Sequence, residues 1–249
     1  MFGIEHYWKV FVNYQSPVQN YLLATLPGAV YERLSPHLEL ISLNLGDTIY
    51  EAGAPQLFVY FPISGIVSKL YQLEDGTSAE VAVVGKEGMI GVALVLGGVS
   101  TSTRAVVQAA GYAYRLLAKQ FKSEMDRHTE LQRLMLVYGQ ALFAQMAQTA
   151  VCNRHHTIDQ QLCRWLLMSM DRLDSHTIAM TQNLISHMLG VRREGVTAAA
   201  AKLHKAGLID YSRGRITVTD RPGLEARVCE CYSAVKAEYA RLLPQNHLS

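Results

Sequence analysis

The sequence predicts an α+β protein with a β jelly roll first, a long helix next and a winged helix-turn-helix at the C-terminal end. Residues 38–117 contain ten of the 18 glycines, set between short β-rich runs. Residues 121–151 contain one glycine and no proline, and their apolar residues recur in steps of three and four. Residues 180–219 give two short helical patterns around Gly190, followed by a tight turn. These three patterns predict, in the same order, a β sandwich, a long helix and a helix-turn-helix.

The chain is long enough for two domains and apolar enough to fold. It has 249 residues, of which 49% are hydrophobic and 18% charged. This composition excludes a disordered or collagen-like chain. We expect a β domain at residues 1–118, a long helix and hinge at 119–152, and a winged helix-turn-helix domain at 153–249.

The two halves differ in charge. Residues 1–150 hold 10 basic and 12 acidic side chains, whereas residues 151–249 hold 13 and 9. A basic half beside a mildly acidic one favours a module that binds a polyanion, attached to a second module.

Strand runs in residues 38–117 are separated by turn signals. The clearest is Glu74-Asp75-Gly76-Thr77, which predicts a hairpin. This segment has no histidine, paired carboxylates or Ser–His set that would indicate catalysis. We therefore predict that the protein is not an enzyme.

Residues 121–151 predict one continuous helix whose apolar stripe pairs across a twofold axis. The predicted seam residues are Leu131, Met135, Tyr138 and Leu142 of the stripe, with Gln145 close to its edge. The alternative is burial of this stripe against the chain's own sandwich. Residues 134–153 carry no charge and could span a bilayer, but Gln140, Gln145, Gln148 and Asn153 interrupt them, so we predict no membrane contact.

A hinge is expected at Cys152–His156, and a capping box of Thr157 and Gln160 should start the next helix. Thr181 can cap a further helix, Gly190 permits a tight turn, and a second helix begins near Arg192. The pattern of residues 211–219 predicts a small hairpin, and that of residues 224–242 predicts one final amphipathic helix.

The second helix of this motif is the one placed to enter a major groove. Arginine can pair with guanine, and glutamate can accept a hydrogen bond from cytosine. The helix dipole disfavours two arginines in a first helical turn, so their presence indicates a phosphate or base partner. The predicted DNA-binding residues are Thr181, Gln182, Arg192, Arg193, Glu194, Thr197, Lys202, Arg213 and Arg215.

With these features, the chain resembles the Crp–Fnr superfamily of bacterial transcription factors over roughly residues 20–220. The most specific match is Gly190-Val191-Arg192-Arg193-Glu194-Gly195-Val196, which is similar to a recognition helix whose Arg-Glu pair reads a G and a C. The resemblance implies a cyclic-nucleotide-binding-type jelly roll and base reading by Arg193 and Glu194. It also implies a homodimer that binds an inverted repeat in DNA and contacts RNA polymerase. Such a protein acts in the cytoplasm. Ala198 stands where the family has a further arginine, so one DNA contact is absent.

The predicted effector site departs further from the family pattern. Its residues are Gly88, Met89, Gly91, Arg104 and Ala105. Met89 stands where the family has its ribose-binding glutamate. Arg104 corresponds to the family's phosphate-binding arginine, so we predict that it contacts an anion. We assign no cofactor and expect a small anionic or nucleotide-like effector. The alternative is a regulator that needs no effector.

Metal and redox sensors fit the sequence poorly. The first cysteine is Cys152, so an N-terminal iron–sulfur cluster is not expected. Haem ligation by His6, His37 or His128 stays open, and His155-His156 at the hinge is a candidate metal ligand pair. Cys229 and Cys231 lie two apart in a helical pattern and should point in opposite directions, so we predict reduced thiols and no metal. The N-terminal residues show no signal-peptide pattern.

Overall fold

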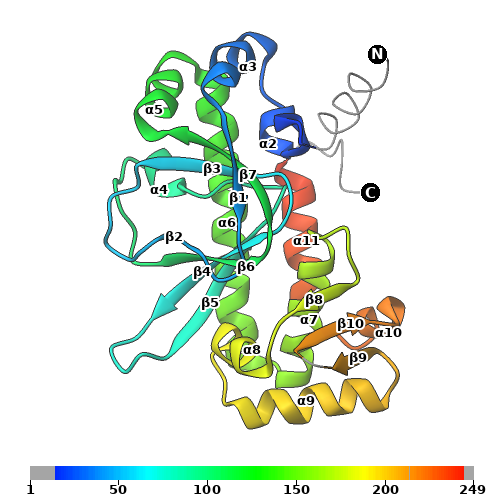
Figure 1. Ribbon diagram of the computed structural model, residues 1–249. Helices are drawn as coiled ribbons and strands as arrows, with labels where there is room; N and C mark the ends of the chain where they lie inside the picture. The colour runs from blue at the N-terminus through cyan, green and yellow to red at the C-terminus, as the bar shows by residue number, and fades with distance from the viewer. Residues whose placement is uncertain (1–14, 213, 244–249) are drawn as a thin grey trace, which may run out of the picture.

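A computed structural model describes residues 15–212 and 214–243 (Figure 1). His6 and Arg213 therefore lie outside the described residues. The description begins with short helices: η1 (Pro17–Gln19), α2 (Tyr21–Ala24), α3 (Gly28–Leu34) and η2 (Ser35–His37). The buried Asn20 holds them to the β domain, because its Nδ2 donates to the carbonyls of Pro62 and Gly88 at 2.9 and 2.8 Å.

Seven antiparallel strands form the predicted jelly roll as two facing sheets. One sheet has the order β1-β7-β3 and the other β2-β6-β4-β5. The strands are β1 (Glu39–Leu43), β2 (Thr48–Tyr50), β3 (Phe58–Pro62), β4 (Ile66–Gln72), β5 (Ser78–Val84), β6 (Arg104–Ala109) and β7 (Gly111–Leu117), with α4 (Val92–Val95) between β5 and β6. The predicted hairpin joins β4 to β5, where Gly76 has a φ of 84° and Asp75 accepts from the amide of Thr77.

The predicted single long helix is two helices, α5 (Ala118–Arg127) and α6 (Thr129–His155). His128 interrupts them with an extended backbone. Its ring contacts Glu124, which also pairs with Arg33 of α3 at 2.7 Å. This tertiary packing turns the chain where the sequence offers neither glycine nor proline.

The stripe of α6 that we predicted at a subunit seam is buried by the chain itself. Leu131, Met135, Tyr138, Leu142 and Gln145 are each at most 2% exposed. Tyr138 donates to the Met89 carbonyl and Gln145 accepts from the Val83 amide, so this face packs on the jelly roll. The predicted role of these five residues is wrong, because a stripe identifies a buried face without saying what buries it. No helix in the described ranges is long and apolar enough to cross a membrane.

The C-terminal part is a winged helix-turn-helix followed by one more helix along α6 (Figure 1). Its elements are α7 (Ile158–Met170), β8 (Thr177–Ala179), α8 (Gln182–Leu189), α9 (Arg193–Lys205), β9 (Ile209–Ser212), β10 (Arg215–Val218), α10 (Arg221–Glu225) and α11 (Cys231–Leu242). The three strands form an antiparallel sheet in the order β8-β10-β9. The single final helix that we predicted is wrong, because residues 226–230 break it into α10 and α11.

Candidate nucleic-acid interface and effector site

The helix-turn-helix is formed by local signals that the sequence carries. The Thr181 hydroxyl accepts from the amide of Leu184 at 3.2 Å and starts α8. Gly190 takes a left-handed φ of 64°, which permits the tight turn into α9. Val196 and Leu203 bury the inner face of α9, and Gly195 lets that helix approach Ile158 of α7.

The first turn of α9 presents charge to solvent. Arg192, Arg193 and Glu194 are exposed, and within the described part of the chain their side chains form no hydrogen bond or ion pair. Arg192 is the N-cap residue and makes no side-chain cap bond, which leaves amide donors at this helix end open. Free guanidinium groups, free amides and a carboxylate together match phosphates and base edges.

Other predicted contact residues have partners inside the chain. The Thr197 hydroxyl donates to Gln182 Oε1 at 2.7 Å, which joins α9 to α8. Lys202 pairs with Asp159 of α7 at 2.9 Å. Thr181 and Arg215 are exposed beside the hairpin of β9 and β10, the wing. Gln182 and Thr197 therefore also fix the position of α9 relative to α8.

The five residues predicted to bind an effector lie in two segments of the jelly roll, one between β5 and α4 and the other at the start of β6. Met89 and Ala105 are at most 1% exposed and belong to the core. Gly88 lies directly against the ring of Tyr138, and Gly91 packs on Val59. Arg104 is half-buried on β6; it donates to Thr48 Oγ1 at 3.1 Å and has Glu51 at 3.7 Å.

Comparison with known proteins gives the same two modules. Residues 40–128 match the cyclic nucleotide-binding domain model, and residues 160–227 match the Crp-like helix-turn-helix domain model. The chain belongs to the Crp–Fnr superfamily of transcription regulators.

Solved structures of other Crp–Fnr proteins share the fold at low identity. FixK2 from Bradyrhizobium japonicum has a TM-score of 0.65 at 18% identity, over 77% of this chain and 98% of that one. A putative crp/fnr-family regulator from Eubacterium rectale has a TM-score of 0.67 at 17% identity, over 86% and 98%. The c-di-GMP-responsive regulator CLP from Xanthomonas campestris has a TM-score of 0.61 at 14% identity, over 77% and 99%. None of the curated protein sequences matches this chain.

One buried cation of this Crp–Fnr regulator was missed by sequence reasoning. Lys69 of β4 is 6% exposed, and burial lowers its pKa to about 8. It lies opposite Ala105 of β6, and the next pair joins Leu70 to Arg104. Its side chain has no hydrogen bond or ion pair among the described residues. A lone lysine inside the apolar run Ile66-Val67-Ser68-Lys69-Leu70 was the available signal.

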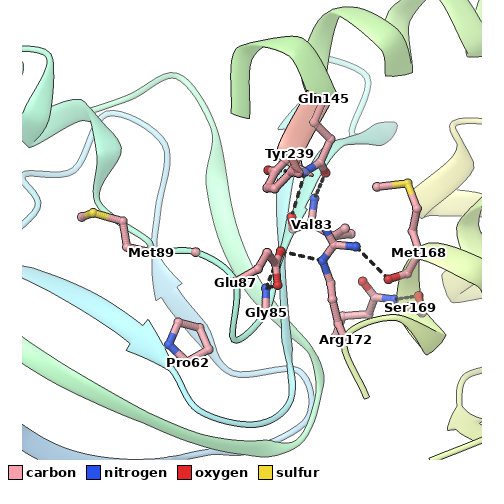
Figure 2. Close-up of polar contacts among 12 residues, drawn as sticks. Pro62, Val83, Gly85, Glu87, Met89, Gln145, Met168, Ser169, Arg172 and Tyr239 are labelled. Atoms are coloured by element: carbon pink, nitrogen blue, oxygen red, sulfur yellow. Dashed lines mark hydrogen bonds and ion pairs between the residues drawn. The ribbon is translucent and has the colours of Figure 1, made fainter. Parts of the chain in front are cut away.

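The jelly roll and the DNA-binding domain meet through buried polar contacts (Figure 2). Arg172, just after α7, donates from Nε to Glu87 Oε1 at 2.7 Å, and both side chains are less than 10% exposed. Gln145 of α6 accepts from the Val83 amide at 2.7 Å and donates to the Tyr239 hydroxyl at 2.8 Å. The joint therefore connects β5, α6, α11 and the segment after α7.

A second buried chain of polar groups crosses the same joint. Ser68 Oγ lies 2.5 Å from Glu80 Oε2 and 2.6 Å from Gln108 Oε1, and Gln108 Nε2 donates to Ser169 Oγ of α7 at 3.3 Å. A serine has one hydroxyl proton, so it cannot donate to both oxygens. If Ser68 donates to Gln108, a protonated Glu80 must donate to Ser68. Burial raises the pKa of Glu80 to about 7, in agreement with this arrangement.

Proposed function

We propose that this Crp–Fnr regulator binds an inverted-repeat operator as a homodimer. The supporting observation is the unpartnered first turn of α9, with Arg193 and Glu194 as the base-reading side chains. A twofold dimer presents two such helices about 34 Å apart, which matches half-sites one helical turn apart.

The dimer interface that we propose is the outer face of α6. Its apolar side chains Leu136, Phe143 and Val151 are 46%, 54% and 48% exposed. Their spacing of seven and eight residues places them on one side of a helix, opposite the face that packs on the jelly roll. Apolar side chains repeated in this way along a long helix favour pairing with a second copy.

Selection of DNA from a random pool with the purified full chain tests both parts. We expect the wild type to retain an inverted repeat. F143E should shift the protein from dimer to monomer in sedimentation and lose the repeat. The matched control is L45E, because Leu45 is 49% exposed in the turn between β1 and β2 of the jelly roll. A wild-type monomer, or an F143E dimer that still selects the repeat, would overturn the proposal.

For the effector, we propose a small anion held inside the jelly roll by Lys69, whereas Arg104 pairs with Leu70 and so lies on the other face of the sheet. A buried cation without a counter-charge is costly, and an anion would remove that cost. The expected result is that K69M unfolds at a higher temperature than the wild type without ligand.

Cyclic AMP and inorganic phosphate are the two probes. One of them should raise the unfolding temperature of the wild type but not that of K69M. The control is K86M, since Lys86 already pairs with Asp174 at 3.1 Å. If neither probe shifts the wild type, the alternative of a regulator without an effector is favoured instead.

A further inference from the structure

Four side chains with metal-binding chemistry converge at the hinge. They are Cys152 at the end of α6, His156 directly after it, Cys229 between α10 and α11, and Cys231 at the start of α11. Their ligand atoms all lie within 4.8 Å of one another. The sequence argument against joint chelation by Cys229 and Cys231 is wrong, because Cys229 lies in the break before α11 and not on a continuous helix.

The distances match a tetrahedral site. Cys152 Sγ and Cys229 Sγ are 3.6 Å apart, and Cys231 Sγ is 3.4 Å from His156 Nδ1. Zinc bonds of about 2.3 Å to sulfur and about 2.0 Å to nitrogen place two sulfurs about 3.8 Å apart and a sulfur and a nitrogen about 3.5 Å apart. One ion can therefore reach all four atoms with little movement of the chain.

The surrounding groups also suit a bound ion. Glu230 Oε2 lies 3.3 Å from His156 Nε2, the ring nitrogen opposite the proposed ligand atom. Gln148 Nε2 donates to Cys231 Sγ at 3.0 Å. A carboxylate behind a histidine and a donor to a thiolate are the outer contacts that orient metal ligands.

Ordinary packing explains these cysteines less well. A buried free cysteine usually acts as a small apolar side chain. Cys163 does so: it lies in the main core of the protein. By contrast, Cys152, Cys229 and Cys231 form a separate small cluster, and among the described residues the partly buried apolar side chain packed against it is Val228. Apolar packing alone gives no reason for His156 Nδ1 to face this cluster with a carboxylate behind it.

We propose that Cys152, Cys229, Cys231 and His156 Nδ1 bind one zinc-type divalent cation per chain. Three thiols and one imidazole form a closed set of four ligands, which is typical of a structural site. Binding replaces the three thiol protons, which are released to solvent. The ion would join the end of α6 to the start of α11 and so fix the hinge that leads to the DNA-binding domain. This proposal does not depend on DNA binding or on an effector.

Cobalt titration of the reduced, metal-free full chain tests the site directly. We expect uptake of one Co²⁺ per chain, with thiolate-to-cobalt absorption in the near ultraviolet and the visible bands of tetrahedral cobalt. Zinc should then displace cobalt and remove both features. Absence of these bands in the reduced wild type would overturn the proposal, whether or not Cys152 and Cys229 form a disulfide on oxidation.

Variants separate binding from folding. C229S should lose the tetrahedral spectrum. E230Q changes an exposed side chain, so it should fold normally and weaken zinc binding roughly 10- to 100-fold in competition with a chromophoric chelator. C163S is the matched control and should bind like the wild type. If C163S weakens binding as much as C229S, or if E230Q and C229S bind zinc as tightly as the wild type, the assignment is overturned.

Discussion

The first turn of α9 and the joint between the domains both contain several charged side chains, but these are exposed in α9 and buried in pairs at the joint. Arg192, Arg193 and Glu194 are exposed and have no side-chain partner among the described residues. At the joint, Glu87 and Arg172 are almost fully buried and meet at 2.7 Å. Charge left open at a surface is available to a partner molecule, whereas charge paired inside the protein holds its parts together.

The two regions also differ in how the chain builds them. Residues 181–197 are contiguous, so caps and a glycine turn are enough to place their side chains. Glu87 and Arg172 are 85 positions apart and are brought together only by the packed fold. We therefore expect changes at the joint to act on stability, and changes at α9 to act on DNA binding alone.

The largest effect is expected from E87Q. The amide leaves the buried Arg172 guanidinium without its counter-charge, and breaking such a pair costs about 3–5 kcal/mol. Denaturant unfolding measures the loss. The control is E238Q, because Glu238 pairs with Arg241 at the surface, where solvent screens the pair, so its loss should change stability little. Equal losses in the free energy of unfolding of E87Q and E238Q would contradict the idea that buried charge pairs at the joint stabilise the protein.

A pH-dependent effect is expected from the second polar chain at the joint. Burial raises the pKa of Glu80 from 4.5 to about 7, so the folded protein favours the neutral carboxyl. Its contribution to stability is fully present below pH 4.5 and is lost as the pH rises through 7. At about 1.4 kcal/mol per pKa unit, this loss is about 3 kcal/mol.

E80Q keeps the shape of the side chain and removes its titration. We expect E80Q to be more stable than the wild type at pH 8, with the difference shrinking toward pH 5. Denaturant unfolding at a series of pH values measures it. A constant difference between E80Q and the wild type across this range would show that Glu80 does not titrate there.

The modules could be predicted from sequence because their signals are local. Thr181 caps α8, Gly190 turns the chain and Asp75-Gly76 closes a hairpin, and each acts within a few residues. The order of jelly roll, long helix and winged helix-turn-helix is therefore confirmed.

Features that depend on distant contacts could not be predicted. No glycine or proline marks the break at residues 226–230, and the cysteine brought near Cys229 lies 77 positions away. The stripe through Leu131 and Tyr138 was recognised as buried, but periodicity gives no information about the surface that covers it. The sequence marks Lys69 only as a lone lysine in the run from Ile66 to Leu70, and its lack of a counter-charge among the described residues is visible only in three dimensions.

The smallest effect on stability, and the clearest on DNA, is expected from R193A. Arg193 is exposed and its side chain has no partner among the residues that the structure describes, so its removal should leave the free energy of unfolding within about 0.5 kcal/mol of the wild type. Loss of a bidentate contact to guanine should cost about 1–3 kcal/mol of binding and relax the preference at one base pair. Binding to the selected operator and to single-base variants of it measures both quantities.

K202A sharpens this last comparison because Lys202 lies on the same helix but already pairs with Asp159. Lys202 is also 65% exposed, and an ammonium group has three donors, so we predict that it contacts phosphate while it pairs with Asp159. Such a contact supports binding without reading sequence, so K202A should weaken binding equally for all operators and reduce its dependence on salt by about one charge. If R193A also weakens all operators equally, Arg193 contacts phosphate, and base reading would fall to Glu194.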